Sequence, residues 1–253
     1  MKGKVRFSGA VALITLLAAP TTSFAYRPFI TEDAGVAGKG VAQLEASWDY
    51  LHWKNGDSDH AFLLVPIYGV TEKLEMSAEV PYILHKAEGE RKVNGIGDIN
   101  VVAKYQLFEE KEILPAFAIK GVIKTNSGST TKGLGTGDLD YSLVAAASKT
   151  LGPFTLHTMF GYTFVGDNGD GNIRDIFLYG FAADYALTDA FHLVGEVAGN
   201  RNPDMTEKND PVSGLVGATY RISEKVTLDG GMRFGFNDAA PDWNSTVGVT
   251  ITF

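Results

Sequence analysis

The chain has 253 residues with 22 basic and 30 acidic side chains, a formal net charge of −8, and no cysteine. The acidic balance argues against a nucleic-acid partner, because such a partner calls for a basic face. Without cysteine, neither disulfides nor thiolate metal sites can form. The hydrophobic share of 45% suits a soluble protein, and it suits a transmembrane β-barrel equally, since only alternate residues of a barrel strand meet lipid.

The N-terminus has the pattern of a cleavable secretion signal. Three basic residues lie among the first six, an apolar stretch covers residues 10–20, and Ser23-Phe24-Ala25 forms a small-x-small cleavage site. We therefore expect a signal peptide over residues 1–25 and a mature chain over residues 26–253. An uncleaved anchor is the weaker alternative, because the apolar stretch is too short to span a bilayer.

A short-period alternation then runs through most of the mature chain. In the last stretch, Ser245, Val247, Val249, Ile251 and Phe253 fall on one face, with threonine and glycine on the other. A period of two residues predicts a strand with one apolar and one polar face. In chain order, the pattern predicts twelve strands, at 41–51, 60–70, 74–84, 98–108, 114–125, 138–149, 154–165, 175–186, 191–200, 212–222, 226–236 and a last one that ends at Phe253.

The connections between these strands alternate in length. Long polar connections at 52–59, 85–97, 126–137, 166–174, 201–211 and 237–243 are separated by short ones at 71–73, 109–113, 150–153, 187–190 and 223–225. Outer-membrane barrels have long external loops and short periplasmic turns. We therefore predict an all-β fold, a single antiparallel transmembrane β-barrel of about twelve strands in the outer membrane of a Gram-negative bacterium. A soluble lipid-binding barrel is the alternative.

The polar faces of the predicted strands are unusually charged. We expect these side chains to form a luminal charge network that narrows a wet interior, either filling it or lining a selective path. The residues are Glu45, Asp49, Glu75, Glu79, Lys104, Lys120, Lys124, Asp140, Asp184, Glu196, Arg221, Asp229 and Arg233. Trp53, Phe236 and Trp243 are expected to form an apolar pore mouth, and Phe253 is the expected assembly signal for the barrel-assembly machinery.

Catalytic and metal-binding patterns are weak. The chain has no Gly-x-Ser-x-Gly elbow, and no serine clearly faces His157 or His192, the two histidines that a lipid hydrolase could use. The stretch at residues 167–172 has carboxylate spacing that hints at calcium, but it lacks the EF-hand order, and turn chemistry explains its Asn-Gly and Asp-Gly pairs. We assign no catalytic residue, cofactor or metal.

Several short motifs carry a family resemblance. They are Arg27-Pro-Phe-Ile-Thr-Glu-Asp-Ala-Gly, Gly38-Lys-Gly with Gln43-Leu-Glu, Tyr68-Gly-Val-Thr-Glu-Lys-Leu-Glu, Gly95-Ile-Gly-Asp with Ala103-Lys-Tyr, Gly135-Thr-Gly-Asp with Asp140-Tyr, and Tyr220-Arg-Ile-Ser. Together they span most of the mature chain, which resembles the outer-membrane transporter family named for the meta-cleavage pathway of phenol degradation. The resemblance implies an uptake channel for small, often aromatic or hydrophobic, molecules, and it brings no catalytic residues.

The expected function is therefore passive uptake of a small-molecule solute across the outer membrane. The sequence has no phosphate-binding Gly-x-x-x-x-Gly-Lys-Ser/Thr loop and no segment that could form a transmembrane helix, so solute can only run down its gradient. Two alternatives remain, a structural or adhesive barrel with a sealed lumen and an outer-membrane lipid hydrolase. The expected partners are outer-membrane lipids, the assembly machinery and the solute, with no nucleic acid.

Overall fold

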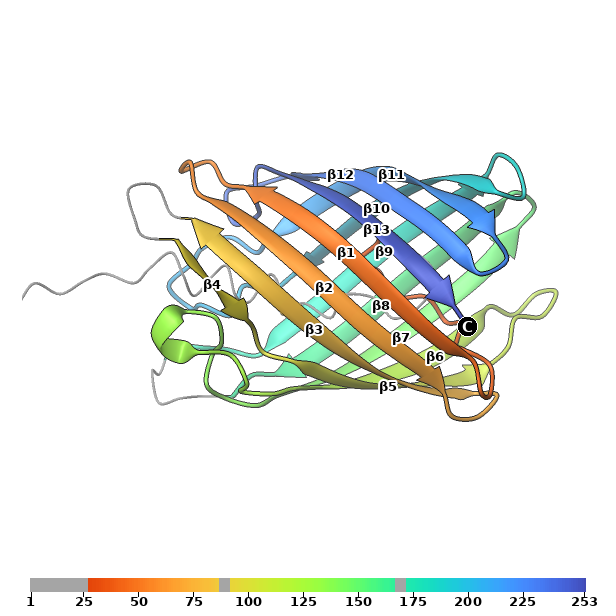
Figure 1. The fold of residues 1–253 in the computed structure, drawn as a ribbon, viewed down its shortest axis with the longest axis horizontal. Coiled ribbons are helices and arrows are strands. Elements are labelled where there is room, and N and C mark those ends of the chain that lie inside the picture. The colour runs from red at the N-terminus through yellow and green to blue at the C-terminus, as the bar shows by residue number, and fades with distance from the viewer. Residues whose placement is uncertain (1–26, 87–91, 167–171) are drawn as a thin grey trace, which may run out of the picture.

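The computed structural model describes residues 27–86, 92–166 and 172–253, and these residues form an antiparallel β-barrel (Figure 1). Its strands are β1 Ala42–His52, β2 Ser58–Gly69, β3 Leu74–Lys86, β5 Asn100–Phe108, β6 Ala116–Lys124, β7 Asp140–Leu151, β8 Phe154–Phe164, β9 Ile176–Ala186, β10 Phe191–Asn200, β11 Val212–Ser223, β12 Val226–Gly235 and β13 Trp243–Thr252. A short strand, β4 Val93–Ile96, and a 3₁₀ turn, Thr130–Lys132, complete the elements. The expected signal peptide lies outside the described residues.

The barrel is closed by the pairing of its first and last strands. β1 pairs with β13 on one side and with β2 on the other, and the sheet runs from β13 back to β5, which pairs with β3. The pairing of β2 with β3 completes the ring, so the predicted twelve-stranded barrel is confirmed, with strand boundaries within a few residues of those expected. The sequence missed β4, a four-residue strand that pairs with β3 inside the predicted long connection. It is too short to show a period of its own.

The outer face of the barrel is apolar, and the inner face carries most of the charge. On β3, Glu75 and Glu79 are 1% exposed and point inward, whereas Met76 and Tyr82 are about 40% exposed and point outward. On β2, Phe62 and Leu64 are exposed between the buried Ala61 and Val65. Large apolar side chains in alternating outward positions are expected where strands face lipid. No helix within the described residues is long and apolar enough to cross a membrane.

The residues before β1 lie inside the ring of strands. We call residues 27–41 the N-terminal segment. Its residues Phe29, Glu32, Ala34 and Ala37 are all at most 3% exposed, although the segment is not itself part of a strand. It joins β1 at the end of the barrel that carries the short turns, where Gly69 N–H donates to the Val41 carbonyl. The long connections lie at the opposite end, on the left in Figure 1, and we call this the long-loop end.

Candidate functional site: the barrel lumen

An acidic pair in the N-terminal segment binds two lysines of the barrel wall. The carboxylate oxygens of Glu32 lie 2.8 Å from Lys104 Nζ and 2.8 Å from Lys120 Nζ, and Asp33 Oδ1 lies 3.5 Å from Lys104 Nζ. Lys104 and Lys120 stand directly opposite each other on β5 and β6, where two like charges would repel. The Glu32 carboxylate offsets that repulsion and ties both strands to the segment.

Acidic wall residues complete this cluster. Glu79 accepts from Lys120 at 3.3 Å and from the Asn100 amide at 2.7 Å, and Glu75 accepts the backbone N–H of Ala37 at 2.7 Å. Both carboxylates and both lysines are at most 1% exposed. Buried charges of this kind are tolerated only when they are paired and hydrogen-bonded. At this level the lumen is therefore filled by the side chains of the segment and the wall.

A second set of contacts holds the start of the segment against the opposite wall. Glu196 accepts the backbone N–H of Ile30 at 2.8 Å and pairs with Arg233 Nη2 at 2.5 Å. Arg27 donates to Thr246 Oγ1 at 2.7 Å, and its Nε lies 3.4 Å from Asp229. The segment thus crosses the lumen and is fixed at both sides.

Apolar side chains of the segment fit between these ion pairs. Phe29 packs with Ala182, Val194 and Leu215, and Ile30 packs against the cluster that includes Met159. Gly180 makes room for the segment, because a Cβ there would lie 2.3 Å from Thr31 Oγ1. Burial of one such phenylalanine contributes about 1.5–3 kcal/mol. The N-terminal segment is therefore bound by apolar packing as well as by charge.

A cavity of about 130 Å³ lies between the start of the segment and the long-loop end. An apolar cavity of about 150 Å³ holds one benzene molecule, so this chamber is close to the size of a single ring. Most of its lining is apolar. The lining residues are Arg27, Pro28, Phe29, Ile30, Asp49, Leu51, Ala61, Leu63, Pro81, Met159, Leu178, Ala198, Gly199, Asn200, Pro211, Ser213, Arg233, Ala240, Pro241, Asn244 and Thr246.

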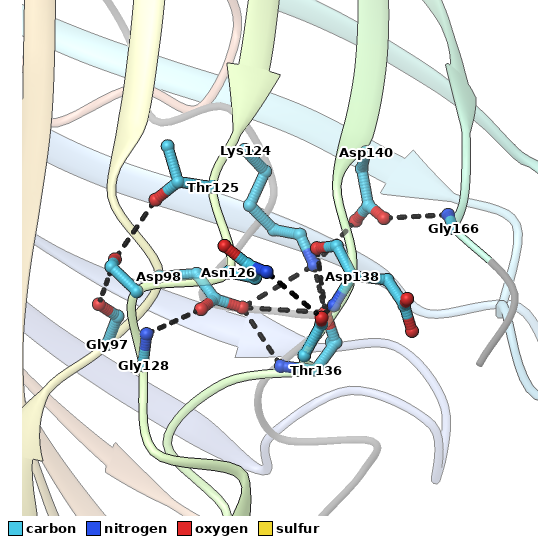
Figure 2. Close-up of polar contacts among 12 residues, drawn as sticks. Gly97, Asp98, Lys124, Thr125, Asn126, Gly128, Thr136, Asp138, Asp140 and Gly166 are labelled. Carbon is cyan, nitrogen blue, oxygen red and sulfur yellow. Dashed lines mark hydrogen bonds and ion pairs between the residues drawn. The ribbon is translucent and has the colours of Figure 1, made fainter.

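A polar network fixes the connection over residues 125–139 at the long-loop end (Figure 2). Lys124 Nζ lies 2.9 Å from Asp140 and 3.5 Å from Asp98, and Asp98 accepts the backbone N–H groups of Gly128 and Thr136 at 2.8 and 2.9 Å. The Asp98 carboxylate thus supplies hydrogen-bond acceptors for backbone N–H groups of the connection that have no partner in a strand. In this way Asp98 holds the connection in place.

The structure brings most of the predicted charged residues together, but in separate groups. Those that surround the N-terminal segment are Glu75, Glu79, Lys104, Lys120, Glu196, Asp229 and Arg233. Lys124 and Asp140 belong to the network at the long-loop end, Asp184 pairs with His192 at 2.7 Å, Glu45 is buried, and Asp49 lines the chamber. Arg221 lies apart from all of these, exposed, and donates to the Asp189 carbonyl at a short turn.

The three residues expected at the pore mouth, Trp53, Phe236 and Trp243, have different surroundings. Trp53 Nε1 donates to Asp59 at 2.8 Å, Trp243 packs on Tyr50 and His52, and Phe236 is 61% exposed. Nearby in the loops, Lys54 and Asp238 form an exposed ion pair at 2.7 Å. The hydrogen bond raises the pKa of Lys54 and lowers the pKa of Asp238. Phe253 follows β13, and its backbone N–H donates to the Ala42 carbonyl of β1 at 2.9 Å.

The expectation that no serine faces His157 was wrong. Ser148 lies opposite His157 on the neighbouring strand, with Oγ 2.8 Å from Nδ1, and the same oxygen accepts the backbone N–H of Ala34 at 2.9 Å. His157 is 2% exposed, so this pair lies under the N-terminal segment and serves to hold it. The described residues contain no group of three or more His, Cys, Asp or Glu side chains that could hold a metal, and residues 167–171 of the stretch that hints at calcium lie outside them.

Sequence reasoning missed the residues of the N-terminal segment itself. Arg27, Phe29, Glu32 and Asp33 entered only as part of a family motif, because a segment without period-two alternation gives no sign of where it packs. Its one available signal was chemical. The acids Glu32 and Asp33 follow the apolar Phe29 closely, and the barrel strands that come after them carry inward lysines. This combination suits a segment that is bound inside the lumen.

Comparisons with solved structures show similar barrels. An outer-membrane channel from Pseudomonas putida F1 matches with a TM-score of 0.73 and 12% identity, covering 87% of this chain and 98% of that one. The KdgM porin matches with a TM-score of 0.56 and 11% identity over 83% and 99%, and the translocator domain of the autotransporter NalP from Neisseria meningitidis with 0.56 and 11% over 86% and 90%. At this identity the likeness shows the fold alone.

Among curated protein sequences no match is found. The model of one protein family, described as "Putative MetA-pathway of phenol degradation", matches residues 25–253. That range includes the N-terminal segment and every strand of the barrel. The chain therefore belongs to this family, as the motifs of its sequence indicated.

Proposed function

We propose that this protein is a passive channel of the Gram-negative outer membrane that takes up small molecules with an apolar body. The observation that carries the proposal is the chamber, an apolar cavity of about 130 Å³ inside a closed barrel whose outer face suits lipid. Binding sites for small ligands are typically apolar cavities with a few polar groups that fix orientation. The chamber has that composition.

In this proposal, the arrangement of the N-terminal segment inside the barrel is the closed state of the channel. Solute reaches the chamber from the long-loop end, and the N-terminal segment blocks the way to the short-turn end through the Glu32, Lys104 and Lys120 cluster. Release of solute on that side requires the segment to move aside. No energy source is needed, because solute runs down its gradient once the segment has moved.

A structural or adhesive barrel is the main alternative, and the buried ion pairs under the segment favour it. If the segment never leaves, the lumen is sealed. An enzymatic role has less support, because Ser148 Oγ contacts His157 and accepts the backbone N–H of Ala34, and Ser148 is not among the residues that line the chamber. Similar solved structures with TM-scores above 0.5 include a channel, a porin and autotransporter domains. Bilayer lipids and the assembly machinery, acting on β13 and on Phe253 that follows it, are the further proposed partners.

The test is solute flux through purified protein in vesicles that contain lipopolysaccharide, comparing labelled phenol with a sugar and subtracting protein-free vesicles. Ala198→Trp fills the chamber, and Val197→Trp is its matched control, because Val197 is the next residue and is 45% exposed on the outer face. We expect phenol flux that Ala198→Trp abolishes and Val197→Trp retains. Absence of flux for every solute would support the sealed barrel, and lipid hydrolysis in the same vesicles would support the enzyme.

A further inference from the structure

The charges around the chamber do not balance. Its two guanidinium groups are already paired, Arg27 with Asp229 at 3.4 Å and Arg233 with Glu196 at 2.5 Å. Asp49 also lines the chamber, and no lysine or arginine among the described residues lies within 4.0 Å of its carboxylate. Three carboxylates therefore share two cations.

The position of Asp49 leaves it without a cationic neighbour in the sheet. Its partners across β1 are Ala61 on β2 and Thr246 on β13, neither of which is charged. Its carboxylate accepts a long hydrogen bond from Ser47 Oγ at 3.3 Å. The side chain is half-buried and faces a cavity that is otherwise mainly apolar.

We propose that the chamber selects small organic cations, with a ring-sized apolar body against the walls and a protonated amine at Asp49. This inference rests on the proposed function and names its solute class. An ammonium group at Asp49 would restore the charge balance with a charge-assisted hydrogen bond, which is about twice as strong as a neutral one. The body needs no further polar contacts, because the remaining walls are built mainly from Leu, Ala, Pro and Met side chains.

An anionic solute fits this chamber poorly. To bind a carboxylate, Arg27 or Arg233 would have to leave Asp229 or Glu196, and that carboxylate would then stay buried without its cation. The solute would also add a fourth negative charge next to Asp49. The chamber therefore discriminates in the order cation, neutral molecule, anion.

The experiment is equilibrium binding to the detergent-solubilised full-length protein, measured by calorimetry with benzylamine, benzyl alcohol and benzoate, which share one ring and differ in charge. We expect benzylamine to bind about tenfold more tightly than benzyl alcohol, the effect of one charge-assisted hydrogen bond, and benzoate to bind most weakly. Asp49→Asn should remove the preference for benzylamine, and Asp189→Asn, the same change at an exposed turn, should keep it.

A second variant, Ala61→Lys, tests the same site in case Asp49→Asn fails to fold. Ala61→Lys places a cation directly opposite Asp49 and should also remove the preference while Asp49 is intact. Equal affinities for benzylamine and benzyl alcohol, or a preference that survives both variants, would overturn the cation site and leave the proposed channel in place. Because binding is measured without a membrane, intact benzylamine binding with no vesicle flux would overturn the channel and leave the site.

Discussion

Glu32→Gln tests whether the N-terminal segment closes the lumen through its ion pairs. The carboxylate contacts Lys104 and Lys120 at 2.8 Å each, and all three side chains are at most 2% exposed. Glutamine keeps the size of the side chain but turns an NH₂ group toward one of the two ammonium groups. The segment should therefore leave the lumen more readily.

The size of the shift caused by Glu32→Gln depends on the ion pairs that remain in the variant. Removing one partner of a buried ion pair costs about 3–5 kcal/mol, and the lower end applies because Glu79 still pairs with Lys120. At about 1.4 kcal/mol per factor of ten, a loss of about 3 kcal/mol shifts the equilibrium between the bound and the released segment about 100-fold. Single-channel conductance in planar bilayers should show a correspondingly larger open fraction.

A labelling assay reports on the segment directly. The chain has no cysteine, so Ala34→Cys introduces a single thiol at a position that is 0% exposed. Glu32→Gln should speed its reaction with a membrane-impermeant maleimide, whereas Glu224→Gln, at an exposed turn, should leave the rate unchanged. If Glu32→Gln changes neither conductance nor labelling, the segment is not held by these ion pairs and the reasoning fails.

Three further predictions concern other parts of the barrel. Gly180→Val should lower the unfolding temperature seen by heat-modifiable gel migration, because its Cβ would lie 2.3 Å from Thr31 Oγ1, and the effect should vanish in a variant that lacks the segment. Asp98→Ala removes two backbone hydrogen bonds of the connection that it holds, so trypsin should cut after Lys132 several-fold faster, and an unchanged rate would contradict the role given to Asp98. Deleting Phe253 should reduce the yield of folded barrel more than deleting a long-loop residue, and equal yields would remove its part in assembly.

The barrel could be predicted from the sequence because its information is local and periodic. The alternation of apolar and polar residues predicted strand β10 at Phe191–Asn200, as the structure has it. The alternation of long and short connections predicted an antiparallel barrel, and the structure has one. The chamber could not be predicted, because it depends on a segment that folds back across the lumen. Arg27 and Asp229 are far apart in the sequence and meet only in the closed barrel. The ring contacts of Trp243 with Tyr50 and His52 could not be predicted either, because they depend on how β1 and β13 pair.

The position of the N-terminal segment has a consequence for how the protein folds. The segment directly precedes β1, and β1 forms the seam with β13, the last strand made. Its partners are spread from Glu75 to Thr246, so its contacts have a high sequence separation and form only when distant strands are in place. Pairing of β1 with β13 and binding of the segment inside the lumen therefore occur together, late in folding. A closed barrel with an empty lumen forms only if these two events are separated.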